Sequence, residues 1–163
     1  RYLEALDQAG LSAAANASDS RAADIRTTLF RMLGRLDKAE GSARRSLDAD
    51  PRLFAELDEL YDLADVSPQK RLDLLSKNHV VVAKRDDSLA REIALLVELD
   101  RHDRAIELLK SHHFHVWEGG GEIHGIYVDA HLLRGQKAMA EGKPEGALQD
   151  FLGRRSRGFR AFR

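Results

Sequence analysis

Residues 29–51 read LFRMLGRLDKAEGSARRSLDADP, and they carry the clearest structural signal of the chain. A helix is expected to end at Gly34, because glycine readily adopts the left-handed conformation that closes a helix. A second helix follows at once, with Ala39 and Ala43 one turn apart. Such small residues let a neighbouring helix approach closely. Pro51 ends the second helix, since proline disfavours the helical conformation in the residue before it. The stretch therefore predicts two helices joined by a tight turn.

The same pattern recurs twice further along the chain. Asp100 stands at the expected turn of the first recurrence, and Ala105 and Leu109 form its close-packing pair. The second recurrence has the most complete set of small and aromatic residues at the matching offsets: Gly135, Gly142, Ala147 and Phe151. Three copies with coherent offsets indicate a helical repeat.

The offsets resemble the second half of a tetratricopeptide repeat. The resemblance implies an all-α fold, an array of helical hairpins wound as a right-handed α-solenoid. Ala23 departs from the pattern, because it stands where the repeat has a large aromatic residue. One helical domain is expected over residues 1–152, followed by a basic tail. The clearest repeats and the tail are at about residues 20–53, 86–117, 128–152 and 153–163.

The segments between these repeats are also expected to be helical. Leucines at helical spacing predict a helix over residues 51–63. Ser67 is expected to cap the next helix, and Pro68 to occupy its first turn. Asn78 caps a short segment of three valines, which is either helical or extended. Asp86 or Asp87 caps the following helix, and residues 12–20 are expected to contain a loop and a helix start.

Composition narrows the classes of function. The chain has no cysteine, which excludes disulfides and thiolate metal sites, and no apolar run near 20 residues. A cytoplasmic, soluble protein is expected, with no membrane partner. The formal net charge is −1, but five arginines and no acids follow residue 152, so residues 1–152 hold 21 bases and 27 acids. Because the net negative charge of residues 1–152 repels the phosphate backbone, we do not expect the chain to bind nucleic acid. The tail either binds an anion or frays.

The segment 112–122, HHFHVWEGGGE, interrupts the pattern. Three consecutive glycines are costly inside a helix, so a long connection is predicted there. Four of its residues are the candidate binding residues: Phe114, His115, Trp117 and Glu118. Their aromatic rings could form a platform for a ligand or a second domain. Alternatively, Phe114 and Trp117 fold back and fill the gap between helix pairs.

Catalysis and metal binding have weaker support in this region. His115, His124 and His131 could ligate a metal, but they lack the i,i+4 spacing of many zinc sites. Glu118 and Glu122 could act as paired carboxylates, but no nucleophile or phosphate-binding pattern accompanies them. We expect no metal, no cofactor and no catalytic residues, and therefore no enzyme activity in this chain alone.

Four motifs together resemble the C-terminal helical region of a family of large bacterial proteins of unassigned function. They are at residues 57–61, 66–75, 85–87 and 114–120, and the resemblance covers about residues 20–152. In that family a β-rich domain, similar to carbohydrate-processing β-sandwiches, precedes the helical region. The resemblance implies that the chain is a fragment of a larger protein.

Two functions follow as expectations. The first is a protein-interaction or scaffolding module that binds a protein segment or a second domain of the same polypeptide. The alternative is an accessory domain of a carbohydrate-active enzyme whose catalytic β-rich domain is absent, with Trp117 and Glu118 reaching the sugar site. The oligomeric state stays open.

Overall fold

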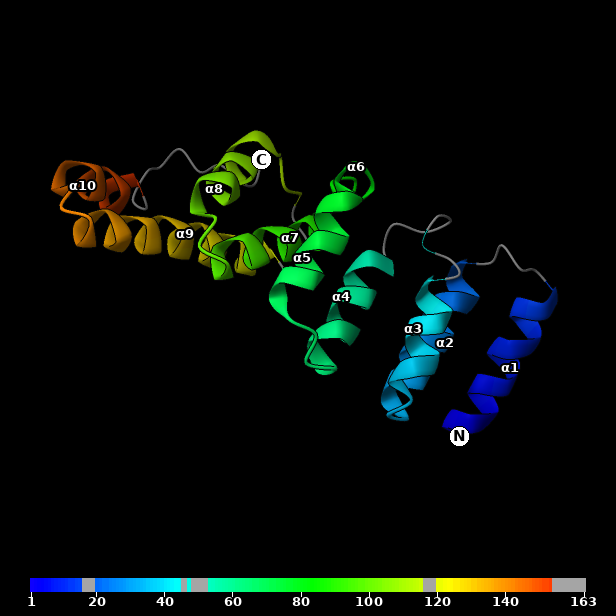
Figure 1. The fold of residues 1–163 in the computed structure, drawn as a ribbon. Coiled ribbons are helices and arrows are strands. Elements are labelled where there is room, and N and C mark those ends of the chain that lie inside the picture. The colour runs from blue at the N-terminus through cyan, green and yellow to red at the C-terminus, as the bar shows by residue number, and fades with distance from the viewer. Residues whose placement is uncertain (16–19, 45–46, 48–52, 116–119, 154–163) are drawn as a thin grey trace. The chain divides into compact units, whose positions relative to one another are not determined.

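The computed structural model describes residues 1–15, 20–44, 47, 53–115 and 120–153. Over these residues the chain forms ten helices and no strand, which confirms the prediction of an all-α fold (Figure 1). The chain divides into two compact units, residues 1–88 and 89–163. From the sequence we expected one helical domain over residues 1–152, with less regular helices between its repeat-like halves.

The first unit contains six helices and the start of a seventh. They are α1 (Tyr2–Ala15), α2 (Ser20–Met32), α3 (Leu36–Arg44), α4 (Leu53–Leu63), α5 (Pro68–Lys77), α6 (His79–Val82) and α7 (Asp86–Glu98). The second unit contains the rest of α7 and three further helices: α8 (His102–Ser111), α9 (Gly120–Ala140) and α10 (Pro144–Gly153).

Four helices end in the same turn. The residues after α2, α4, α7 and α9 that adopt left-handed φ angles of 68°, 54°, 63° and 72° are Gly34, Asp65, Asp100 and Gly142. In each turn the left-handed residue donates its N–H to the carbonyl three residues back, and the next residue donates to the carbonyl five residues back. This is the Schellman arrangement, which satisfies carbonyls at the helix end. Each turn leads directly into the next helix.

The sequence predicted three of these turns and missed the fourth. Gly34, Asp100 and Gly142 lie where the repeat pattern placed them. Asp65 was not anticipated, because only glycine and, less often, asparagine or aspartate tolerate this conformation, and an isolated aspartate is a weak signal.

The core of the first unit is formed by residues of α1, α2, α3 and α4. Phe30, Ala39 and Leu60 form a buried cluster, and Leu6 and Leu36 pack against it. Ala39 has no exposed surface, as the close approach of α2 and α3 requires. Helix α1 packs against α2 and was not predicted, since its apolar residues show little periodicity.

A buried ion pair joins α4 to α5. Arg71 donates from Nε and Nη2 to the two carboxylate oxygens of Asp58, both at 2.9 Å, and it also pairs with Asp62. Asp58 is 1% exposed. Because an isolated buried charge is costly, the two side chains depend on each other.

Several local predictions about helix starts need correction. Pro68 does occupy the first turn of α5, but the Ser67 side chain makes no capping hydrogen bond. Asn78 precedes α6, yet its amide donates to the Leu74 carbonyl at 2.8 Å instead of capping α6. The three valines are helical, which settles the alternative. Asp87 accepts from the Ser88 N–H at 2.7 Å within the first turn of α7.

The N-terminal boundaries also differ from expectation. Residues 12–15 continue α1 as helix, whereas the sequence indicated a loop there. Residues 16–19 lie outside the described part of the chain, and α4 is described from Leu53. Gly153 ends α10, and the remainder of the predicted basic tail, residues 154–163, also lies outside it.

In the second unit, α9 packs against both α8 and α10. Ala105 and Ala147 are fully buried, as expected for residues at close helix contacts. Gly135 faces the ring of Phe151, so that the small residue on α9 accommodates the aromatic residue on α10. This helix contact positions the side chains described next.

Candidate functional site

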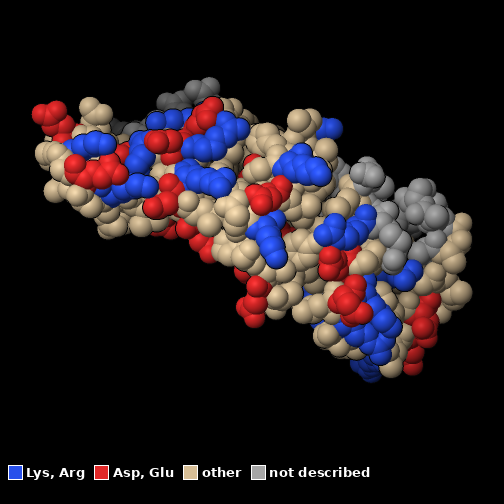
Figure 2. Space-filling view, in the orientation of Figure 1, with Lys and Arg blue, Asp and Glu red and all other residues tan. Residues whose placement is uncertain are grey.

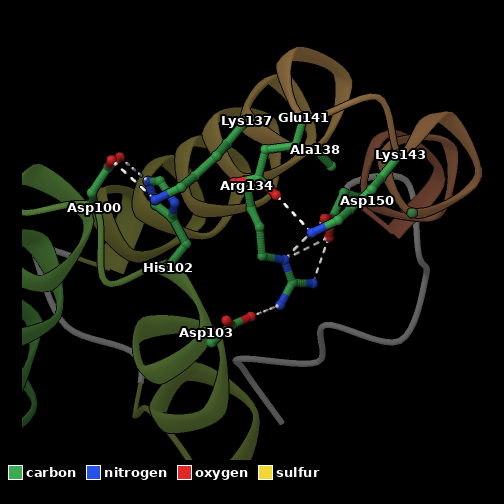
Figure 3. A pocket seen from close by; sticks show the side chains of 10 residues that line it. Asp100, His102, Asp103, Arg134, Lys137, Ala138, Glu141, Lys143 and Asp150 are labelled. Atoms are coloured by element: carbon green, nitrogen blue, oxygen red, sulfur yellow. Dashed lines mark hydrogen bonds and ion pairs between the residues drawn. The ribbon is translucent and has the colours of Figure 1, made fainter.

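A cleft of about 290 Å³ lies in the second unit, between the start of α8, the C-terminal half of α9, and α10. Its walls are strongly polar. The acidic side chains that line it are Asp100, Asp103, Glu141 and Asp150. The remaining polar side chains of the lining are His102, Arg134, Lys137 and Lys143. Figure 3 shows these eight side chains converging from the three elements.

Local structure explains how they converge. Asp100 is the left-handed residue of the α7–α8 turn, which places it beside the first turn of α8. Arg134 and Lys137 are three residues apart on α9, so they share one helix face, and Glu141 follows directly after the end of that helix. Asp150 is fixed on α10, whose contact with α9 is set by Ala147 and Phe151.

Arg134 is the centre of the charge network. It donates to Asp150 on α10, with Nε 2.9 Å from Oδ2 and Nη2 2.5 Å from Oδ1, and its Nη1 lies 2.7 Å from Asp103 Oδ1 on α8. Hydrogen bonding to Asp150 raises the pKa of Arg134 above its ordinary value. One guanidinium thus links three helices, with bidentate geometry toward Asp150.

Asp150 is held from its other side by His131. The Nδ1 atom of His131 lies 2.8 Å from Asp150 Oδ1. Burial favours the neutral carboxyl group, but hydrogen bonds from Arg134 and His131 outweigh it and lower the pKa of Asp150. The Tyr127 ring packs edge-on against His131, and its hydroxyl donates to the Gly153 carbonyl at 3.3 Å. Asp150 and Arg134 therefore form the fixed floor of the site.

The other ion pairs of the cleft lie near solvent. Lys137 Nζ is 3.2 Å from Asp100 Oδ2, with side chains 49% and 70% exposed. Lys143 Nζ is 2.8 Å from Glu141 Oε2, also on exposed side chains. Exposed pairs of this kind are weak because solvent and salt screen their charges, so a charged ligand can replace either partner.

His102 lies at the base of the cleft. It is 3% exposed, and its Nε2 makes no hydrogen bond, although Asp100 Oδ1 is 3.6 Å away. Burial lowers the pKa of His102, and the nearby charges of Lys137 and Arg134 act in the same direction against Asp100 and Asp103. The imidazole is therefore neutral near pH 7.

The chemistry of the cleft suits recognition of charge. Acidic and basic side chains interleave over α9 and α10, without a large patch of either sign (Figure 2). In the described ranges, no group of three or more His, Asp or Glu side chains is arranged to hold a metal ion. A charged ligand can therefore replace one partner of the exposed ion pairs, while Arg134 and Asp150 stay fixed beside it.

Two of the four candidate binding residues predicted from the sequence, Phe114 and His115, lie in the described part of the chain and outside the cleft. Phe114 is fully buried, with its ring 4.7 Å from that of His112, in agreement with the packing alternative for this residue. His115 is exposed, with its ring 5.6 Å from that of His113. Trp117 and Glu118 lie outside the described residues. Neither Phe114 nor His115 lines the cleft.

The cleft itself was missed at the level of sequence. Asp100 and Asp150 line the cleft, and Gly142 flanks it. In the sequence Asp100 and Gly142 indicated only turns, and Asp150 was an ordinary acidic residue of a helix. Their convergence depends on the packing of α8 and α10 on the same helix α9, which repeat spacing alone does not specify.

No protein-family model matches the chain, and no solved structure matches it. Among the helices described, none is both long enough and apolar enough to cross a bilayer.

Proposed function

We propose that the chain is a tetratricopeptide-type scaffolding module, whose charged cleft in the second unit binds a segment of another protein or of a second domain of the same polypeptide. The cleft between α8, α9 and α10 is the observation that carries this proposal. Its side chains can bind ionic groups, but they include no set arranged as nucleophile, base and orienting group.

The recurrent turn supports the same proposal. Four helix ends close with one hydrogen-bond pattern, at residues 34, 65, 100 and 142. Hairpins repeated in this way present helix faces at which binding residues can be exchanged without changing the scaffold. The separation from 100 to 142 is the longest and includes the glycine-rich segment.

Binding is also favoured by the fixed Arg134–Asp150 pair and by the weakness of the exposed ion pairs around it. Arg134 is fixed by Asp150 and Asp103, whereas Lys137 and Lys143 are held by exposed pairs. A ligand that replaces those pairs loses little in breaking them, and it meets a preorganised surface. The alternative of an accessory domain in a carbohydrate-active enzyme rests on Trp117 and Glu118, and no structural observation on the described residues carries it.

A charge swap within the cleft tests the proposal. Peptides selected for binding to the full chain are expected to lose affinity for the double variant Glu141→Lys/Lys143→Glu, because this ion pair of the cleft is kept while its polarity is reversed. The matched control is Arg104→Glu/Glu107→Arg, which reverses an exposed pair of α8 that does not line the cleft. Equal affinity of selected peptides for both swapped proteins would reject the cleft as the binding site.

A further inference from the structure

The side chains of His102 and Asp100 face each other at the base of the cleft without a hydrogen bond between them. His102 Nε2 and Asp100 Oδ1 are 3.6 Å apart, and Nε2 has no hydrogen-bond partner. With the ring proton on Nδ1, Nε2 of the neutral imidazole carries a lone pair and accepts a hydrogen bond. A donor nitrogen placed about 2.9 Å from each atom would satisfy both, because their separation allows it.

Lys137 covers these two atoms in the free protein. Its side chain runs toward Asp100 and ends beside His102 (Figure 3). The ammonium bonds Oδ2 of Asp100 at 3.2 Å and makes no hydrogen bond to His102 Nε2. The pair is exposed and weak, so the base of the cleft opens when Lys137 moves away.

The surrounding charge favours a positively charged ligand. Residues 89–153 contain 11 acidic and 7 basic side chains. Asp100 and Asp103 are among the more exposed charges of the cleft, with side chains 70% and 91% accessible. Arg134, in contrast, is bound to Asp150 and Asp103. The two exposed carboxylates of Asp100 and Asp103 attract a basic group to this part of the cleft.

We propose that the cleft binds an arginine side chain of a basic protein segment, whose guanidinium replaces the Lys137 ammonium and donates to Asp100 and to Nε2 of His102. Arginine suits the site better than lysine, because its planar fork presents several donors in fixed directions and is less strongly hydrated. This inference rests on the proposed function and names the chemistry of the partner.

The proposal has a distinct pH dependence. Asp100 and Asp103 face His102 from the turn and from α8, and Lys137 and Arg134 face it from α9. Protonation of His102 removes the acceptor at Nε2 and places a second cation beside the guanidinium. Binding of the arginine is therefore expected to weaken as the pH falls through the pKa of His102, which burial lowers, whereas an acidic ligand would bind more tightly at that lower pH.

The test is calorimetric titration of the full chain at low ionic strength with two hexapeptides, one of alternating Arg and Ser and one of alternating Glu and Ser. The Arg peptide is expected to bind, and Asp100→Asn to weaken it about tenfold through loss of a charge-assisted hydrogen bond. Asparagine tolerates the left-handed conformation, so this variant keeps the turn. Lys137→Gln is expected to strengthen binding roughly threefold, because it removes the competing cation.

The control is Asp129→Asn, which removes an equal charge from an exposed position of α9 outside the cleft. Equal weakening by Asp100→Asn and Asp129→Asn would show general charge attraction and overturn the inference. Tighter binding of the Glu peptide, weakened by Lys137→Gln, would also overturn the inference and leave the proposed function standing. No binding of either peptide at the cleft, judged by amide chemical shifts, would count against both.

Discussion

Gly135 on α9 lies directly against the ring of Phe151 on α10. A methyl group at position 135 would be 2.5 Å from Cε1 and 2.9 Å from Cδ1 of that ring. Real side chains essentially never approach this closely, so the contact requires glycine. It also sets the distance between the two helices that carry Arg134 and Asp150.

Gly135→Ala is therefore expected to destabilise the protein, although alanine has the higher helix propensity by about 1 kcal/mol. Overpacking against Phe151 costs about 1–3 kcal/mol and exceeds that gain. In a Phe151→Ala background the clash is absent, and the same change should become stabilising. Gly125→Ala, on the same helix with nothing within 4 Å, should stabilise in either background. Chemical denaturation measures all four variants, and destabilisation by Gly135→Ala without Phe151 would disprove the contact.

Substitutions at two left-handed turn residues, Gly142 and Asp65, should change the free energy of unfolding in opposite directions. Gly142→Ala should lower the free energy of unfolding by about 1–2 kcal/mol, because a Cβ is strained at φ 72°. Asp65→Gly should raise it by a smaller amount, since Asp65 is exposed and already adopts φ 54°. Thermal unfolding of the two variants tests the turn assignment. It would be wrong if Asp65→Gly were as destabilising as Gly142→Ala.

The buried ion pair of the first unit predicts strong coupling. Arg71→Met should cost about 3–5 kcal/mol, because it removes the two hydrogen bonds that Arg71 donates to the buried carboxylate of Asp58. Asp58→Leu combined with Arg71→Met should cost less than Arg71→Met alone, since both charges are then gone. A double-mutant cycle by urea unfolding gives the coupling energy, and additive losses would show that the two side chains act independently.

His102 predicts a pH dependence of stability. Its pKa is lowered in the folded state, first by burial, so the fold favours the neutral imidazole. That contribution is present above the unfolded value of about 6.5 and is lost as the pH falls through the folded pKa. Unfolding free energies measured between pH 7.5 and 5 should therefore decrease, with a smaller slope in His102→Gln. His124→Gln, which changes an exposed histidine, should retain the full slope. Equal slopes in His102→Gln and the unmodified chain would contradict the burial of a neutral His102.

The fold class was predictable because its signals are local. Gly34 and Gly142 mark turns that glycine adopts at little cost, and Ala39 and Ala147 mark close helix contacts. Helix α1 escaped prediction because its apolar residues lack clear periodicity and its stability comes from packing on α2. Local propensity does not report such tertiary stabilisation.

The candidate site was not predictable from the sequence in the same way. Asp103, Arg134 and Asp150 are ordinary charged residues of helix surfaces, and they become a site only when α8 and α10 pack on α9. His102 carried no motif, and its significance lies in its burial without a hydrogen bond at Nε2. Phe114, which we predicted from the sequence as a candidate binding residue, is part of the core.

The charged cleft of the second unit is the proposed binding site for a protein segment. The most direct test of this proposal is the map of backbone amide chemical-shift changes in the full chain on addition of a peptide that binds it. We expect the changes to centre on Asp100 to Asp103 and on the facing parts of α9 and α10, and the Glu141→Lys/Lys143→Glu swap to abolish them. Changes confined to residues 1–88, or unaffected by the swap, would contradict it.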